Sequence, residues 1–182
     1  MSLIRHIYLA YFSQPKADRI LYRLIRRHRI CRIVELGVGN GLRATRLIKS
    51  VQSANPAAAI KYTGIDLFEM RPTGGPTGMP LKDAYRLLKS TGIQPQLVPG
   101  DPFSALARVA NALQGTELVV ISADQDRASL ARAWFYLPRL LTPTSLIFSE
   151  ELDATSGVTA LRQLTPLEIE RLAGTAERRR AA

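Results

Sequence analysis

The sequence Ile33-Val34-Glu35-Leu36-Gly37-Val38-Gly39-Asn40-Gly41 joins an apolar strand to three alternating glycines. A helix-like segment, residues 42–48, follows directly. Glycine has no Cβ and adopts positive φ at little cost, so such a loop can turn sharply and lie against a ligand. The stretch therefore predicts a nucleotide-like cofactor site between a strand and a helix. A tight turn that binds no ligand is the structural alternative.

The spacing of these glycines departs from the dinucleotide-binding fingerprint Gly-x-Gly-x-x-Gly. The third glycine comes one residue early, and Leu42 stands where the fingerprint requires glycine. Glu35 precedes the first glycine by two residues, and its negative charge suits a cationic ligand better than a pyrophosphate. These departures disfavour NAD as the cofactor.

The segment 35–41, with Thr45 after it, resembles motif I of the class I S-adenosylmethionine-dependent methyltransferases. The resemblance implies that the loop wraps the methionine part of S-adenosylmethionine. It also implies that a carboxylate holds the ammonium group of the cofactor, directly or through water. The loop residues that we accordingly predict to bind the cofactor are Glu35, Gly37, Gly39, Asn40 and Gly41.

Two downstream carboxylates extend this resemblance. A second predicted strand, residues 61–67, ends in Asp66, whose carboxylate can accept both ribose hydroxyls; we also place Leu67 in the cofactor site. A third strand, 96–98, leads to Asp101, which the resemblance puts near the adenine amino group. Each has a structural alternative: Asp66 as a turn or N-cap aspartate, and Asp101 as ordinary Pro-Gly-Asp-Pro turn chemistry.

A fourth predicted strand, residues 118–121, leads into Ser122-Ala123-Asp124-Gln125-Asp126. From there to Glu151 the sequence resembles the branch related to small-molecule O-methyltransferases. That branch carries a metal-binding aspartate where Ser122 stands and a histidine where Gln125 stands. Since a hydroxyl is a poor ligand for Mg²⁺, we expect no catalytic metal; we assign Ser122 to cofactor binding.

Proton transfer from the acceptor needs a group near the predicted site. We predict Asp124 as the catalytic residue, with Glu150 or Tyr11 as alternatives.

The alternation of strands with helical segments predicts an α/β fold with a doubly wound, mostly parallel, Rossmann-like sheet. We expect a single globular domain with an N-terminal helical cap (1–29), a cofactor-binding core (30–152) and a C-terminal strand, helix and basic tail (153–182). The family ends its sheet with a helix and an antiparallel hairpin, for which this chain has hardly enough room. We expect one strand over 158–164 and a helix beginning at 165–168, so the site is either reduced or completed by a second subunit in a homodimer.

Composition and charge narrow the protein class. The 182 residues are 46% hydrophobic, enough for a sizeable core, and the single Cys31 excludes a disulfide framework within the chain. The sequence has no long apolar run and no signal-peptide pattern, so we predict a cytoplasmic protein without membrane association. The net charge is +10, concentrated over residues 16–32 and 178–180. Nucleic acid is therefore a candidate partner, and a merely solvated basic face is the alternative.

These observations predict an S-adenosylmethionine-dependent methyltransferase that transfers the methyl group in line to an unidentified small acceptor. Two alternatives stay open. Ser122, Gln125 and the short C-terminus favour a catalytically reduced cofactor-binding or interaction module. The arginine-rich N-terminal helix favours an RNA-binding methyltransferase-like protein.

Overall fold

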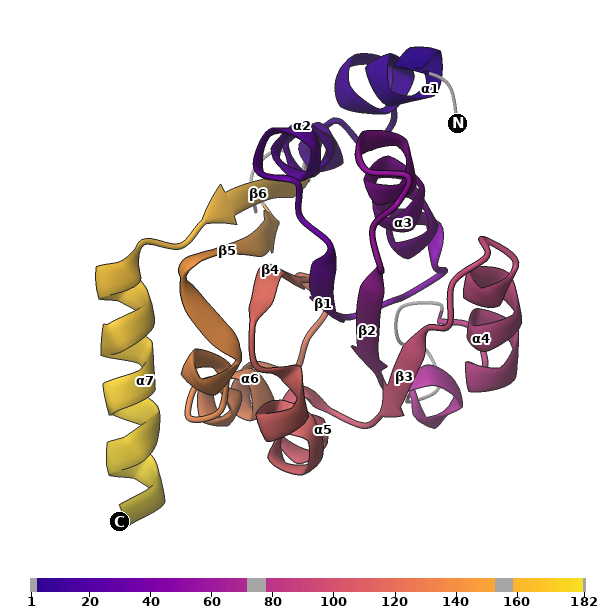
Figure 1. Ribbon diagram of the computed structural model, residues 1–182. Coiled ribbons are helices and arrows are strands. Elements are labelled where there is room, and N and C mark those ends of the chain that lie inside the picture. Colours follow the sequence, from indigo (N-terminus) through magenta and orange to yellow (C-terminus); the bar gives the residue numbers. More distant parts are fainter. Residues whose placement is uncertain (1–2, 72–77, 153–158, 182) are drawn as a thin grey trace.

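The computed structural model describes residues 3–71, 78–152 and 159–181. Its centre is a six-stranded sheet with the strand order β3-β2-β1-β4-β5-β6 (Figure 1). All neighbouring strands are parallel except β5 and β6, which are antiparallel. The strands are β1 (Arg32–Leu36), β2 (Lys61–Asp66), β3 (Gln96–Pro99), β4 (Thr116–Ile121), β5 (Leu141–Leu152) and β6 (Thr159–Gln163).

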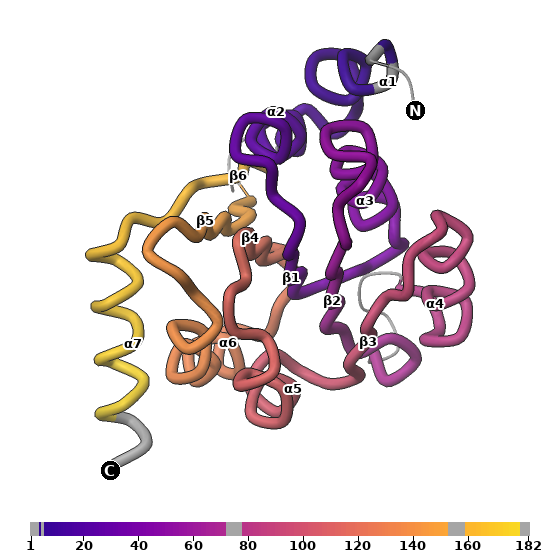
Figure 2. Tube along the Cα trace, in the orientation of Figure 1, coloured from indigo at the N-terminus to yellow at the C-terminus, as the bar shows by residue number. Residues whose placement is uncertain are grey.

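Helices cover both faces of this sheet (Figure 1). The α-helices are α1 (Leu3–Ile7), α2 (Arg19–His28), α3 (Leu42–Ala54), α4 (Leu81–Lys89), α5 (Pro102–Val109), α6 (Arg127–Ala133) and α7 (Pro166–Ala181). Short turns of other helix types are η1 (Tyr8–Phe12), η2 (Lys16–Asp18), η3 (Phe68–Met70), η4 (Ala110–Leu113) and η5 (Leu137–Leu140). The trace in Figure 2 shows α1 standing by α2 and α3 at one end of the molecule, with α7 along another side.

The apolar strands bury both of their faces. Along β4, Leu118 and Val120 pack with the helices α2, α3 and α4, whereas Val119 and Ile121 pack with α5, α6 and α7. Successive strand residues point to opposite sides of a sheet, so an uninterrupted Val/Ile/Leu run supplies two cores at once. This continuous apolar pattern is typical of a parallel sheet covered on both faces.

The predicted α/β fold with a mostly parallel sheet is confirmed. Beyond β5, the described residues contribute one strand to the sheet rather than the two of the family's hairpin. This strand, β6, pairs antiparallel with β5 and places Arg162 opposite Ser149. Helix α7 begins with the expected capping pattern, because the Thr165 backbone N–H donates to the Glu168 carboxylate at 2.8 Å. Position 158 of the predicted strand lies outside the described residues. No helix in the described part of the chain is long and apolar enough to cross a membrane.

The topology determines where a site can form. Strand β1 is flanked by β2 on one side and β4 on the other, so the crossover connections change direction at β1. In open α/β sheets, ligands bind outside the carboxyl ends of the strands at such a switch point. The segments after β1, β2 and β4 begin with Gly37, Leu67 and Ser122 and lie at this edge.

Candidate functional site

The glycine loop after β1 packs against the end of β4 and leaves one residue open to the outside. A Cβ on Gly37 would lie 2.6 Å from the Ser122 Cβ, which is closer than real contacts allow. A Cβ on Gly39, where φ is +57°, would meet nothing within 4 Å. Gly37 is therefore required for packing, whereas the space beside the Gly39 Cα is open and would let a ligand approach the loop.

Glu35 lies fully buried beneath this loop. Its Oε2 accepts a hydrogen bond from the Tyr62 hydroxyl at 2.6 Å, and its Oε1 has no partner. Burial raises the pKa of Glu35 to about 7, although Arg43 and Tyr62 oppose the shift. A buried carboxylate oxygen without a partner is unfavourable, and a cationic ligand in the adjoining space would satisfy it.

A cavity of about 230 Å³ adjoins the loop, and Asp18, Glu35, Arg43 and Ser122 line it together with Gly39. Arg43 donates to Asp18 Oδ1 at 2.8 Å and to Glu150 Oε1 at 2.6 Å. The carboxyl groups of Asp18, Glu35 and Glu150 thus lie near the single guanidinium of Arg43. Because negative groups outnumber the positive one, this part of the molecule attracts cations.

Asp66 links the end of β2 to the glycine loop. Its Oδ2 accepts from the Gly39 backbone N–H at 2.8 Å, and its Oδ1 accepts from the Phe68 backbone N–H at 2.9 Å. Arg71 donates to the same two oxygens, from Nε to Oδ1 at 3.0 Å and from Nη2 to Oδ2 at 2.7 Å. Asp66 therefore lies next to Gly39, at the end of β2 where the sequence predicted a cofactor-binding carboxylate. Its pairing with Arg71 was not predicted from the sequence.

Asp124 belongs to the same ion-pair network. It accepts from Arg71 Nη1 at 2.7 Å and from Gln125 Nε2 at 2.8 Å. Burial acts to raise the pKa of Asp124, but the hydrogen bonds from Arg71 and Gln125 outweigh it and hold the pKa below its usual value. A carboxylate of this kind accepts protons poorly, which argues against proton abstraction by Asp124.

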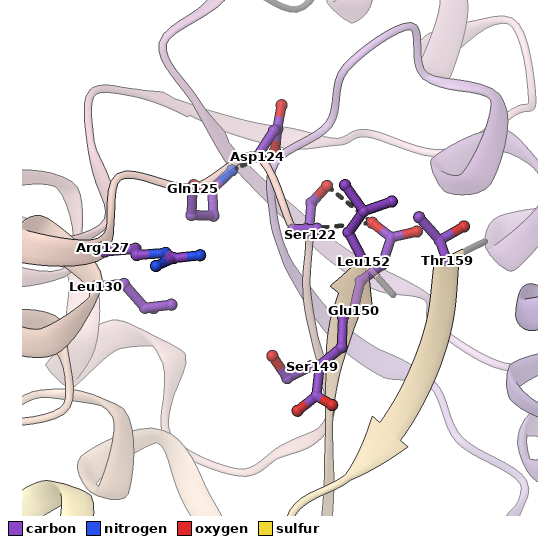
Figure 3. Close-up of a pocket in the computed structure, with 11 residues that line it drawn as sticks. Ser122, Asp124, Gln125, Arg127, Leu130, Ser149, Glu150, Leu152 and Thr159 are labelled. Carbon is purple, nitrogen blue, oxygen red and sulfur yellow. Dashed lines mark hydrogen bonds between the residues drawn. The ribbon is translucent and has the colours of Figure 1, made fainter. Parts of the chain in front are cut away.

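A larger cavity of about 780 Å³ lies between the ends of β4 and β5 and the start of α6. Arg127 and Leu130 of α6 lie across it from Ser122 and Glu150 (Figure 3). Ser122 lines both this cavity and the smaller one, and its hydroxyl donates to Glu150 Oε2 at 3.1 Å. The two cavities therefore adjoin at Ser122, an arrangement that suits a cofactor on one side and an acceptor on the other.

Asp101 has a structural role at the start of α5. Its carboxylate accepts from the backbone N–H groups of Phe103 at 3.1 Å and Ser104 at 3.2 Å, and from the Ser129 hydroxyl. Asp101 thus caps α5 and connects it to α6. This structural role is the alternative to the predicted adenine contact. Gly100 donates its backbone N–H to the Asp66 carbonyl at 2.9 Å, so Asp101 still lies close to the cofactor edge of the sheet.

Comparison with known proteins identifies the fold. No family model matches the sequence, and no curated protein matches it. Among solved structures, the O-methyltransferase of tomaymycin synthesis from Streptomyces achromogenes, in complex with SAM, is similar with a TM-score of 0.56, 12% identity and coverage of 99% of this chain and 78% of that chain. This chain has the Rossmann-like fold that these methyltransferases share. The TDP-rhamnose 3'-O-methyltransferase of calicheamicin biosynthesis gives a TM-score of 0.58, 17% identity and coverage of 85% and 78%. An O-methyltransferase family protein from Burkholderia thailandensis is similar with a TM-score of 0.53 and 15% identity, and the match covers 93% of this chain and 52% of that chain.

Within this methyltransferase fold the predicted cofactor residues form two groups. Five of them line the smaller cavity: Glu35, Gly37, Gly39, Asn40 and Ser122. Asp66 adjoins this cavity through its hydrogen bond to Gly39. The other predicted residues, Gly41, Leu67 and Asp101, are not among those that line it. Within the described ranges no three His, Cys, Asp or Glu side chains are grouped to hold a metal ion.

Sequence reasoning missed Asp18, Arg43 and Arg71. Asp18 reaches the cavity because η2 brings the N-terminal segment over the start of α3. Arg43 lies in the first turn of a helix and Arg71 follows a strand, and an arginine at such a position is usually a solvated side chain, so no sequence signal marks either residue.

The capping role of Asp101 gives a first prediction. We expect Asp101→Ala to lower the free energy of unfolding by about 1 kcal/mol, because two backbone N–H groups of α5 lose their acceptor. Asp101→Asn retains a capping oxygen, so its loss should be smaller. Urea denaturation of both variants measures this, and equal losses would contradict the capping account.

The buried carboxyl group of Glu35 gives a second prediction. Its pKa of about 7, against an ordinary 4.5, means that its contribution to stability is present at acidic pH and is lost as the pH rises through about 7. Glutamine does not titrate and can still accept from Tyr62. We therefore expect Glu35→Gln to become more stable relative to the wild type between about pH 5 and about pH 8, by up to roughly 3 kcal/mol. A stability difference that is the same at both pH values, measured by urea denaturation, would show that Glu35 is not perturbed.

Proposed function

We propose that this protein binds S-adenosylmethionine at the glycine loop and transfers its methyl group to a small acceptor in the larger cavity. The observation that carries the proposal is the buried Glu35, whose unpartnered Oε1 lies beneath a loop that leaves open space beside Gly39. The fold supports it, because the similar structures are O-methyltransferases and one of them was solved with SAM.

The residues present fit this cofactor. Glu35 would hold the ammonium group of its methionine part, and the excess of carboxyl groups near Arg43 favours a positively charged molecule. Asp66, beside Gly39, would hold the ribose hydroxyls.

When bound, S-adenosylmethionine supplies a methyl group that its sulfonium already activates. The work that remains for the protein is to position the acceptor, exclude water and stabilise charge. Ser122 and Glu150 stand at the junction of the two cavities and would orient the acceptor there. The ion pair of Asp124 with Arg71 favours an electrostatic contribution at Asp124 over proton abstraction.

A protein that binds the cofactor but catalyses no reaction would use the same cofactor residues. Ser122 favours this alternative, because the resembled O-methyltransferase branch has a metal-binding aspartate at that position. Transfer of a labelled methyl group to an acceptor distinguishes the two functions. A homodimer that completes the larger cavity and a cytoplasmic location also remain predictions from the sequence.

Cofactor binding is testable by calorimetry with S-adenosylhomocysteine. We expect micromolar affinity for the wild type and a loss of tenfold or more, about 1.4 kcal/mol, in Glu35→Gln, because the uncharged glutamine can accept a hydrogen bond from an ammonium group but cannot form an ion pair with it. Glu170→Gln removes an exposed carboxylate from α7 and serves as the matched control. Absence of binding to the wild type would overturn the proposed function, and equal affinities of the two variants would exclude the role of Glu35.

A second candidate function rests on the N-terminal helices. We propose that α2 and η1 together bind single-stranded nucleic acid. The guanidinium of Arg23 lies 6.0 Å from the centre of the Tyr11 ring, and the Phe12 side chain is 65% exposed. Among the described residues, no carboxylate forms an ion pair with Arg23 or Arg27. Exposed rings stack on bases while arginines contact phosphates, so this surface combines the two groups that such binding uses.

Fluorescence anisotropy with a labelled single-stranded RNA tests this function. We expect Arg23→Gln combined with Arg27→Gln to weaken binding and to reduce the slope of log affinity against log salt by about 1.4, because two phosphate contacts are lost. Arg86→Gln is the control, since Arg86 already pairs with Asp83 on α4. Equal weakening by the control would indicate a nonspecific effect of net charge.

A further inference from the structure

The Asp66 carboxylate has no free position for another donor. A carboxylate offers about four lone-pair sites, two on each oxygen. Oδ1 accepts from the Phe68 backbone N–H and from Arg71 Nε, and Oδ2 accepts from the Gly39 backbone N–H and from Arg71 Nη2. All four sites are therefore used within the chain itself.

Only two of these four donors can leave without rearranging the fold. The Gly39 and Phe68 N–H groups belong to the backbone, in the glycine loop and in η3. The glycine loop is also held to β2 by the hydrogen bond from the Gly37 N–H to the Ile65 carbonyl. Arg71 contributes the other two through a side chain that can rotate. A ribose diol needs two acceptor positions on Asp66, and the positions that can be released are those that Arg71 holds.

We infer that Arg71 competes with the ribose hydroxyls of the cofactor for Asp66, and that this competition sets the affinity of the site. The inference rests on the proposed function. In chemical terms, a planar guanidinium fork imitates the paired hydroxyls of the ribose, because both present two donors to one carboxylate. Arg71 is thus an affinity-determining residue and not a catalytic one.

The pair that must separate is well shielded from water. The side chain of Arg71 is 11% exposed and that of Asp66 is 2% exposed. Charge-assisted bidentate hydrogen bonds in such surroundings are strong, so opening them lowers the apparent affinity for the ligand. Residue 78 also contacts the arginine, since a Cβ on Gly78 would lie 2.5 Å from Arg71 Nε.

Arg71 has a second partner that remains when it leaves Asp66. Its Nη1 donates to Asp124 Oδ2 at 2.7 Å, which links the segment after β2 to the segment after β4. The arginine can therefore rotate away from Asp66 and keep one carboxylate. This second ion pair lowers the energetic cost of displacement by a ligand, because the guanidinium keeps a carboxylate partner while the ligand hydroxyls donate to Asp66 in its place.

Adenosine is the probe that isolates this competition, because it carries the ribose and no net charge. We expect Arg71→Ala to bind adenosine at least fivefold more tightly than the wild type in calorimetry. The gain should be much smaller for 2'-deoxyadenosine, which lacks one of the two hydroxyls. Arg86→Ala, which removes an exposed arginine that also pairs with an aspartate, should leave both affinities unchanged.

Arg71→Lys covers the case in which Arg71→Ala fails to fold after losing a buried ion-pair partner. Lysine retains the charge but lacks the planar fork, so we expect an intermediate gain. Unchanged or weaker adenosine binding in both variants, with wild-type binding to S-adenosylhomocysteine intact, would overturn the inference and leave the proposed function standing. Failure of the wild type and all variants to bind either ligand would overturn both.

Discussion

The hydrogen bonds on the Asp66 carboxylate connect the parts of the candidate site to one another. The Gly39 N–H reaches it from the loop after β1, and the Phe68 N–H reaches it from the turn after β2. Neighbouring parallel strands bring these two loops to the same edge of the sheet, and the carboxylate fixes their relative position. A single buried carboxylate thus holds the glycine loop in place, and the two acceptor positions that Arg71 occupies on it suit a ligand with paired donors.

A second group of charges determines the chemistry of the smaller cavity. Arg43 pairs with Asp18 from the N-terminal segment and with Glu150 from β5, so three distant parts of the chain meet beside Glu35. Burial raises the pKa of Asp18 as it does that of Glu35. The carboxyl groups of this region outnumber its guanidinium group, so a cationic ligand would supply positive charge that the region lacks.

The two cavities relate this electrostatic arrangement to a reaction. The smaller one is bounded by the glycine loop and the buried acids, and the larger one by α6 and the ends of β4 and β5. Ser122 lines both. Its hydroxyl therefore stands where a molecule in one cavity would face a molecule in the other.

Most of the sheet could be predicted from sequence because its strands are short apolar runs that end in turn residues. The residues 118–121 and the loop 37–41 are examples, and the structure places both as expected. The partners of the charged residues could not be predicted in this way. Arg43 and Glu150 are separated by 107 positions, and Arg71 and Asp124 by 53. Ion pairs at such separations depend on the completed fold, and the same local sequence around Asp101 suits either a helix cap or a ligand contact.

A crystal structure of the protein with S-adenosylhomocysteine tests the central claim most directly. The account predicts the ribose hydroxyls on Asp66, the ligand ammonium group beside Glu35, and Arg71 paired with Asp124 alone. A ligand bound away from the glycine loop, or one bound there while Arg71 keeps both of its hydrogen bonds to Asp66, would contradict it.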